Sequence, residues 1–224
     1  LPSECMGESI SDWSRFERLT PFRVRDVLLV ASHFDHYLLE ESGYLAEIMQ
    51  EEYSDLNLSQ APRIIHSPDA RDALGLLRTR EFDLVITMTR VGEMDVKAFG
   101  TEAKRIVEGL PVVMLSHNTR ELATLSAGEG IDRIFVWTGD SRILLSICKL
   151  IEDERNVEND VRDGDVQVIL LIEDSRRFYS MYLPLLYRQL VEQTTRLMGE
   201  GGNLHQKLLR LRARGKILLA SDMN

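Results

Sequence analysis

Few stretches of this sequence place acidic, imidazole or hydroxyl side chains at a spacing that could support chemistry. Glu173 and Asp174 are adjacent acids that directly follow the apolar run VILLI. Two neighbouring carboxylates could hold a hard cation such as Mg²⁺, which prefers oxygen ligands. The same two acids would also be favourable at the start of a following helix without any metal. The residues alone leave both interpretations open.

A second cluster of polar side chains is the segment SHFDH, residues 32–36. Asp35 could be combined with the later Asp95 into a metal site, but Asp35 lies near a predicted helix start, where aspartate caps free N–H groups. His33 and His36 lack a second cluster at ligand spacing. We therefore interpret these residues as structural.

The composition limits the possible classes of function. The 224-residue chain is 44% hydrophobic and carries a net charge of −9. This charge argues against nucleic acid as the main partner, because phosphate binding needs concentrated Lys and Arg. The one basic segment, residues 207–216, has leucines at helical spacing and predicts a packed helix with solvated arginines. We expect a cytoplasmic protein, since no membrane span or signal peptide pattern occurs. Cys5 and Cys148 lie far apart in the sequence, and we expect both to be free thiols in a reducing compartment.

The elements that would position these residues alternate between strands and helices from residue 24 onward. Buried strands are predicted at residues 26–32, 61–67, 83–88, 111–115 and 133–137, with helices between and after them. Ser67 is the predicted cap of the second helix. Strands that are apolar without alternation are covered on both faces. The sequence therefore predicts an α/β fold, a flavodoxin-like doubly wound parallel five-stranded sheet in the order 2-1-3-4-5.

The chain divides into four predicted segments. Residues 1–23 form an extension that docks as a short helix, and residues 24–155 form the main domain. Residues 156–164 are either a linker or an extension of the last helix, whose apolar spacing continues to about Asp163 and would suit a coiled-coil arm. Residues 165–224 repeat the opening pattern, because VQVILLIEDS resembles VRDVLLVAS. Only a β-α-β portion of this second unit is present, which should leave an open strand edge.

Ligands of an open parallel sheet bind at the carboxyl ends of its strands. The first unit presents five residues there, which are Ala31, Ser32, Met88, Ser116 and Trp137. The order of elements, with the stretches DLVITM, GEMD, LPVVMLS and ILLIEDS, resembles the receiver domains of bacterial two-component response regulators.

In that family an acidic pair after strand one holds magnesium, and an Asp ending strand three accepts a phosphoryl group. A Thr or Ser follows strand four and a Lys follows strand five. Carried over by position, the acidic pair falls on Ala31 and Ser32, the phosphoacceptor on Met88 and the lysine on Trp137, and Ser116 alone matches. Because a thioether cannot replace a carboxylate nucleophile, the resemblance implies a degenerate pseudo-receiver without phosphotransfer or a cofactor.

The second unit differs from the first, since Glu173 and Asp174 stand where the family's acidic pair belongs. The resemblance therefore implies possible magnesium binding in an intact second unit. A narrower resemblance rests on LLEESGYLAEIMQEEYSDLNLSQAPRI, FDLVITM, LPLLYRQLVEQTTRLM and RLRARGKILLA. These stretches are similar to the N-terminal receiver-like region of phosphoenolpyruvate synthase or pyruvate, phosphate dikinase-like proteins.

These patterns predict a non-catalytic signalling module that acts through protein-protein interaction. We expect it to bind a protein partner through the face of strands four and five, or a second copy through the extended last helix, and to bind neither nucleic acid nor membrane. One alternative is a regulatory fragment of a phosphoenolpyruvate synthase-like phosphotransferase. Another is a flavodoxin-like domain that binds a small molecule, although no glycine-rich phosphate loop is present.

Overall fold

The first unit is a five-stranded parallel sheet. The structure is a computed structural model that describes residues 17–41, 61–117, 127–128, 130–140, 142–197 and 213–221. The strands are β1 (Asp26–Val30), β2 (Arg63–Ser67), β3 (Leu84–Met88), β4 (Val112–Ser116) and β5 (Arg133–Val136). Their order is β2-β1-β3-β4-β5, and every neighbouring pair is parallel. The predicted flavodoxin-like sheet is confirmed.

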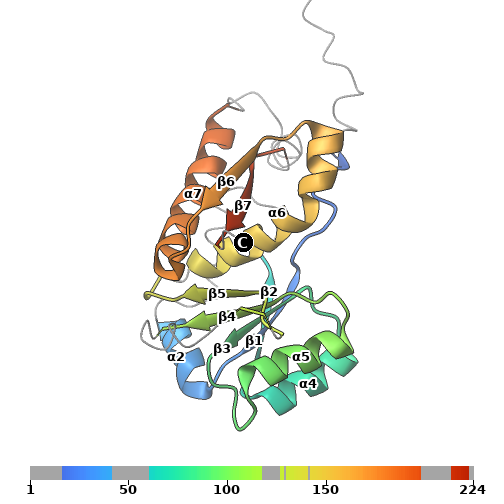
Figure 1. Cartoon of the computed structure of the whole chain (residues 1–224), viewed down its shortest axis with the longest axis vertical. Coiled ribbons are helices and arrows are strands. Elements are labelled where there is room, and N and C mark those ends of the chain that lie inside the picture. The colour runs from blue at the N-terminus through green and yellow to red at the C-terminus, as the bar shows by residue number, and fades with distance from the viewer. Residues whose placement is uncertain are drawn as a thin grey trace, which may run out of the picture.

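Helices cover both faces of this sheet. Figure 1 shows α6 (Arg142–Gly164) on one face and α4 (Ala70–Thr79) and α5 (Val96–Ile106) on the other. The first strand leads into α2 (His33–Glu41). The predicted helix around residues 120–126 and the continuation of the first helix beyond residue 41 lie outside the described residues.

Two aspartates begin the helices of the α4–α5 layer. Asp69 accepts hydrogen bonds from the N–H groups of Arg71 and Asp72, and Asp95 caps α5 in the same way. The prediction of Ser67 as the cap of α4 was wrong, because Ser67 is the last residue of β2 and the chain turns at residues 68 and 69 before the helix begins. Asp95, which the sequence analysis considered together with Asp35 for a metal site, is the cap of α5.

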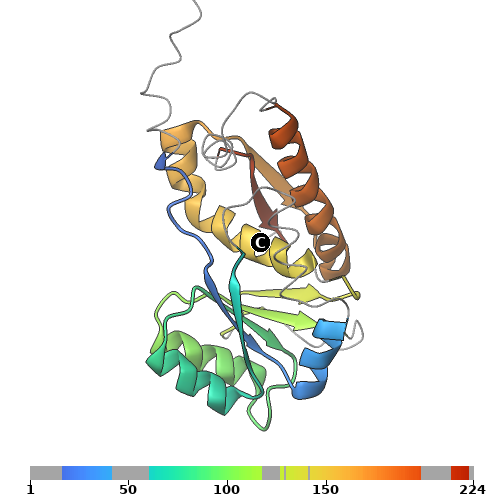
Figure 2. The same ribbon diagram turned by 180° about the vertical axis from the view of Figure 1, so that it is seen from behind.

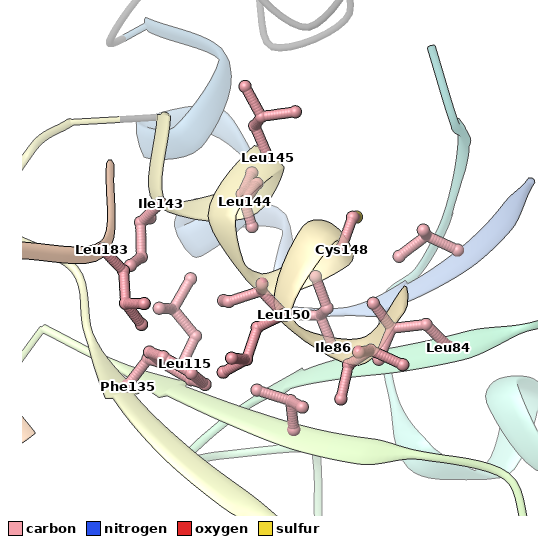
Figure 3. Packing of buried hydrophobic residues seen from close by; sticks show 14 of the residues in the cluster. Leu84, Ile86, Leu115, Phe135, Ile143, Leu144, Leu145, Cys148, Leu150 and Leu183 are labelled. Atoms are coloured by element: carbon pink, nitrogen blue, oxygen red, sulfur yellow. The ribbon is translucent and has the colours of Figure 1, made fainter. Parts of the chain in front are cut away.

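The core between the sheet and α6 joins the strands to the last helix of the first unit. Side chains from β3, β4 and β5 meet the apolar face of α6 (Figure 3). Cys148 lies within this layer, and burial raises the pKa of its thiol to about 12. Since α4 and α5 bury the opposite face, the central strands β3 and β4 are buried along their whole length, as expected for a parallel sheet.

The second unit adds a two-stranded sheet and one long helix. Strands β6 (Val168–Ile172) and β7 (Lys216–Ala220) pair in parallel, and α7 (Arg176–Leu197) connects them. This β-α-β order repeats that of β1, α2 and β2. Figure 1 shows α6 and α7 on either side of the β6–β7 pair.

Helix α7 covers the edge strand of the first sheet. The Val136 N–H donates a hydrogen bond to Ser180 Oγ at 2.9 Å, and the Tyr179 hydroxyl donates to the Ile134 carbonyl. An uncovered edge strand would expose unpaired backbone groups, so α7 protects this one. We predicted that a protein partner binds the face of strands four and five. Helix α7 of the same chain covers part of this surface, at β5.

A buried polar face of α6 fixes the N-terminal segment. The carboxamide of Asn156 accepts from the Phe22 N–H at 2.9 Å and donates to the Phe22 carbonyl at 2.8 Å. Glu152 and Asp160 also accept hydrogen bonds from backbone N–H groups, those of Val24 and Thr20. Of the predicted extension at residues 1–23, Glu17 is helical, whereas residues 20–23 are not helical and Thr20 has a positive φ of 51°. Residues 1–16 lie outside the described part.

The same face of α6 binds the second unit through Asp153, which is fully buried. Its carboxylate accepts two hydrogen bonds from Arg214 at 2.8 and 2.9 Å, one from the Tyr187 hydroxyl at 3.0 Å and one from the Ile217 N–H at 2.9 Å. Although burial alone would lower it, the pKa of Arg214 is raised by Asp153. The prediction of a helix with solvated arginines was wrong for the described end of that segment, since Arg214 is only 5% exposed and lies in a turn.

Helix α6 passes the predicted boundary at residues 155 and 156 without a break. The predicted coiled-coil arm rests on apolar residues spaced along α6. Of these, Ile143, Ile147 and Leu150 are buried in the core, whereas Val161 is 41% exposed. The helix therefore packs along its own chain and does not project as a free arm. Within the described residues, no helix is both long and apolar enough to span a bilayer.

Candidate functional site

The carboxyl edge of the five-stranded sheet brings three of the predicted site residues into one apolar cluster. Ala31 and Met88 are buried, at 0% and 1% exposure, and both belong to the core that faces α6. Trp137, directly after β5, packs against the same cluster. The three side chains share this face because alternate residues of a strand point to the same side of the sheet.

This cluster offers little to a cation or a phosphoryl group. Ala31 has no side-chain ligand atom, and the thioether of Met88 is a soft donor that Mg²⁺ does not favour. The indole N–H of Trp137 is buried and has no hydrogen-bond partner among the described residues. The indole N–H can donate a hydrogen bond but carries no positive charge.

The two serines at this edge have structural positions. Ser32 Oγ accepts a hydrogen bond from the Asp35 N–H at 3.1 Å and donates to the Asp35 carboxylate at 2.7 Å, so the pair forms the N-terminal turn of α2. Ser116 is 1% exposed, and its backbone carbonyl accepts a hydrogen bond from the backbone N–H of Trp137 at 2.9 Å. The expectation that Asp35 has a structural role near a helix start agrees with this turn, although Ser32 is the capping residue.

Asp35 also contacts the end of β4. Its carboxylate lies 3.0 Å from His117 Nε2, and the His117 ring meets the indole of Trp137 with a centroid separation of 5.7 Å. The carboxylate is thus shared between a helix terminus and an imidazole. This link between strands one, four and five was not predicted, since nothing in the local sequence around His117 distinguishes it.

A cluster of three histidines lies beside this edge. The rings of His36 and His66 stack with centroids 3.9 Å apart, and His33 meets His66 edge-on at 5.8 Å. His66 Nε2 is 2.8 Å from the Ala31 carbonyl. Burial lowers the pKa of His36, and the neighbouring His66 lowers it further. The sequence pairs His33 with His36, but His66 joins them only because β2 and β1 are neighbours.

Metal-binding geometry is not present in the described part of the chain, where no three His, Cys, Asp or Glu side chains are arranged to hold an ion. In the second unit, Glu173 Oε1 accepts a hydrogen bond from the Ser175 N–H at 2.9 Å. Asp174 is exposed and has no such local partner among the described residues. The two predicted ligands therefore differ in their surroundings.

Asp174 lines a cavity between the two units. The cavity has a volume of about 630 Å³ and is also lined by Arg133, Arg155 and Arg176. Glu154 lies against the Arg133 guanidinium in this cavity, and burial raises the pKa of Glu154 more than Arg133 lowers it. The cavity therefore lies between the carboxyl ends of β6 and β7 and the amino end of β5, and several basic side chains line it.

Comparisons with known proteins find likeness only among solved structures. No family model matches the chain, and no curated protein matches it. The chain is similar to the signal receiver domain of an HD domain-containing protein from Pseudomonas fluorescens Pf-5, at 21% identity and a TM-score of 0.46, covering 62% of this chain and 94% of that chain. It is also similar to a CheY-like response regulator receiver domain protein from Methanospirillum hungatei JF-1, at 18% identity and a TM-score of 0.46, covering 60% and 98%.

A further similar structure is the N-terminal domain of a response regulator/sensory box/GGDEF 3-domain protein from Carboxydothermus hydrogenoformans. It is 16% identical with a TM-score of 0.41, and the alignment covers 61% of this chain and 98% of that chain. The fold assignment of the first unit rests on its own strand order and parallel pairing.

Proposed function

We propose that this chain is a signalling module of receiver type that works by protein-protein interaction, without catalysis and without phosphorylation of its first unit. The observation that carries the proposal is the apolar cluster of Ala31, Met88 and Trp137 at the carboxyl edge of the sheet. A phosphoryl-accepting site there would need a carboxylate nucleophile, oxygen ligands for magnesium and a cation, and these three positions supply none of them.

Magnesium binding is proposed only for an intact second unit, at Glu173 and Asp174. In the described structure Asp174 faces a cavity with Arg133, Arg155 and Arg176, whose cationic side chains favour an anionic ligand over a cation. This cavity is also the observation that favours the alternative of a domain that binds a small molecule, because about 300–1,000 Å³ is typical for such sites. The resemblance to the front region of phosphoenolpyruvate synthase-like proteins remains an expectation about the parent protein.

The experiment is a calorimetric titration of the chain with magnesium and beryllium fluoride, which mimics a phosphoryl group. We expect no heat that can be assigned to the first unit. Any heat should vanish in Asp174→Asn and persist in the control Asp132→Asn, since Asp132 lines the same cavity but pairs with Lys104. Heat that survives Asp174→Asn, or a phosphoryl adduct on the first unit after treatment with acetyl phosphate, would contradict the proposal.

A further inference from the structure

Four of the five histidines of this chain lie at the carboxyl edge of the first sheet. His33 and His36 lie in α2, which follows β1, His66 is the last residue but one of β2, and His117 directly follows β4. Figure 2 shows α2, the helix drawn in blue, beside the arrowheads of this sheet. Histidine is the side chain whose charge changes most readily near neutral pH, so this edge is rich in groups that respond to protons.

Three of these residues, His33, His36 and His66, form the histidine cluster. The His36 ring stacks on the His66 ring with centroids 3.9 Å apart and an angle of 18° between the planes, and His33 meets His66 edge-on at 5.8 Å. His66 Nε2 lies 2.8 Å from the Ala31 carbonyl, and it donates a hydrogen bond to β1 because a carbonyl can only accept. Neutral rings can stack in this way, whereas two positively charged rings at this separation repel each other.

The charged groups around the cluster do not compensate for added protons. On α2, Glu40 Oε1 lies 3.7 Å from His36 Nε2, but the Glu40 side chain is 54% exposed, so water weakens the attraction. Asp35, in the first turn of α2, faces His117 instead. Burial and the two neighbouring histidines lower the pKa of His36 more than Glu40 raises it. Protonation of His36 is therefore unfavourable while α2 contacts β2.

Helix α2 buries little apolar surface in its described part. Among residues 33–40, Leu39 alone is fully buried, whereas Phe34 and Tyr37 are 68% and 57% exposed. Helix α5, on the other face of the sheet, buries four of its residues. A segment with few buried apolar contacts opens at a lower free energy than the fold as a whole. The stacked imidazoles are therefore a large part of what holds α2 on the sheet.

We propose that the histidine cluster is a pH-sensitive switch, in which neutral rings hold α2 on β2 and uptake of a proton releases α2 from the carboxyl edge of the sheet. A histidine in an open segment titrates near pH of about 6.5, whereas the pKa of His36 is lower on the sheet, so protons favour the released form as the pH falls below about 6.5. The switch rests on the proposed signalling role for its purpose, because it gives the unphosphorylated first unit a regulated element. Its test does not depend on phosphoryl chemistry.

The test is amide hydrogen exchange of the full chain at about pH 7.5 and about pH 5.5, expressed as protection factors so that the direct effect of pH on exchange is removed. We expect the protection of α2 to fall about tenfold or more at the lower pH, since one pKa unit is a tenfold change in an equilibrium, while α5 stays protected. His36→Gln should remove most of this fall. The control His117→Gln should keep or enlarge it, because a protonated His117 attracts Asp35 and holds the start of α2.

Three outcomes would overturn the proposal. These are an α2 whose protection is the same at both pH values or absent at both, exchange of α2 and α5 together as one unit, or a fall in His36→Gln as large as in the unchanged chain. If α2 is already unprotected in His36→Gln at neutral pH, His36→Phe replaces it, since this ring can stack on His66 without titrating. An unprotected α2 in both variants would mean that the contact is structural only, and the proposal fails.

Failure of the switch can be told apart from failure of the proposed function. An α2 that does not respond to pH, in a chain whose first unit also binds no beryllium fluoride, would refute the switch and leave the unphosphorylated first unit intact. Binding of beryllium fluoride to the first unit would contradict the proposed function whatever α2 does.

Discussion

The buried carboxylate of Asp153 should dominate the attachment of the second unit, and Asp153→Asn tests this directly. The side chains of Asp153 and Arg214 are 0% and 4% exposed, so the substitution removes a charge that water cannot replace. The amide presents one oxygen and one N–H₂ group, which cannot accept both guanidinium bonds. Removing one partner of a buried ion pair costs about 3–5 kcal/mol, because the other charge stays buried without compensation.

The measurement is urea denaturation followed by far-UV circular dichroism. Asp163→Asn on the same helix is the control, because Asp163 pairs with Arg162, whose side chain is 70% exposed, and such pairs contribute about 0–1 kcal/mol. We expect the loss in Asp153→Asn to exceed that in Asp163→Asn by at least about 2 kcal/mol. Equal losses in the two variants would refute the conclusion that the Asp153 network holds the second unit in place.

Three further predictions concern single side chains. Because the pKa of His36 is lowered by burial and by His66, the unfolded chain binds more protons below about pH 6.5, so stability should fall from about pH 7 to about pH 5.5. His36→Gln should reduce this slope in urea titrations, and an unchanged slope would contradict it. Cys148, with a pKa of about 12, should react with iodoacetamide at about pH 8 only after unfolding, as peptide mass spectrometry would detect, and rapid native labelling would refute its burial. Tyr179→Phe removes the hydrogen bond to the Ile134 carbonyl and should lower the free energy of unfolding by about 1 kcal/mol in urea denaturation. Compared with the unchanged chain, the substitution should speed amide hydrogen exchange in β5 more than in β1. Unchanged stability and exchange would show that α7 does not protect the edge.

The sheet of the first unit could be predicted from the sequence because its determinants are local. Each strand is a short apolar run, as in residues 84–88, and parallel sheets buried on both faces produce such runs wherever they occur. The positions at the strand ends follow once the strands are placed. The positions of Ala31 and Met88 at the carboxyl ends of β1 and β3 could therefore be predicted from the sequence, whereas their place in one apolar cluster was not predicted.

The polar contacts of α6 could not be predicted, because they join residues far apart in sequence. Asn156 and Asp160 read as part of a charged, solvated segment, yet both are fully buried. Their partners at Phe22 and Thr20 lie more than 130 residues away. Arg214 was misassigned for the same reason, since a local count of arginines carries no information about the carboxylate of Asp153 on α6.

The histidine cluster shows an intermediate case. The pair His33 and His36 is visible in the sequence, and its neighbour His66 follows from the predicted sheet order once β1 and β2 are paired. The stacking of His36 on His66 depends on the side-chain geometry at the strand end, which a periodicity argument does not contain.

The hydrogen bond from Lys216 Nζ to Thr20 Oγ1, at 2.9 Å, joins residues 196 positions apart. During synthesis this contact cannot form until almost all of the described chain has left the ribosome. The five-stranded sheet is complete by residue 136, so its strands can assemble while the second unit is still being made. The N-terminal segment can dock on α6 once residue 164 has been made, because Glu152, Asn156 and Asp160 bind its backbone. The bond from Lys216 to Thr20 is then added last and joins the second unit to a contact that is already in place.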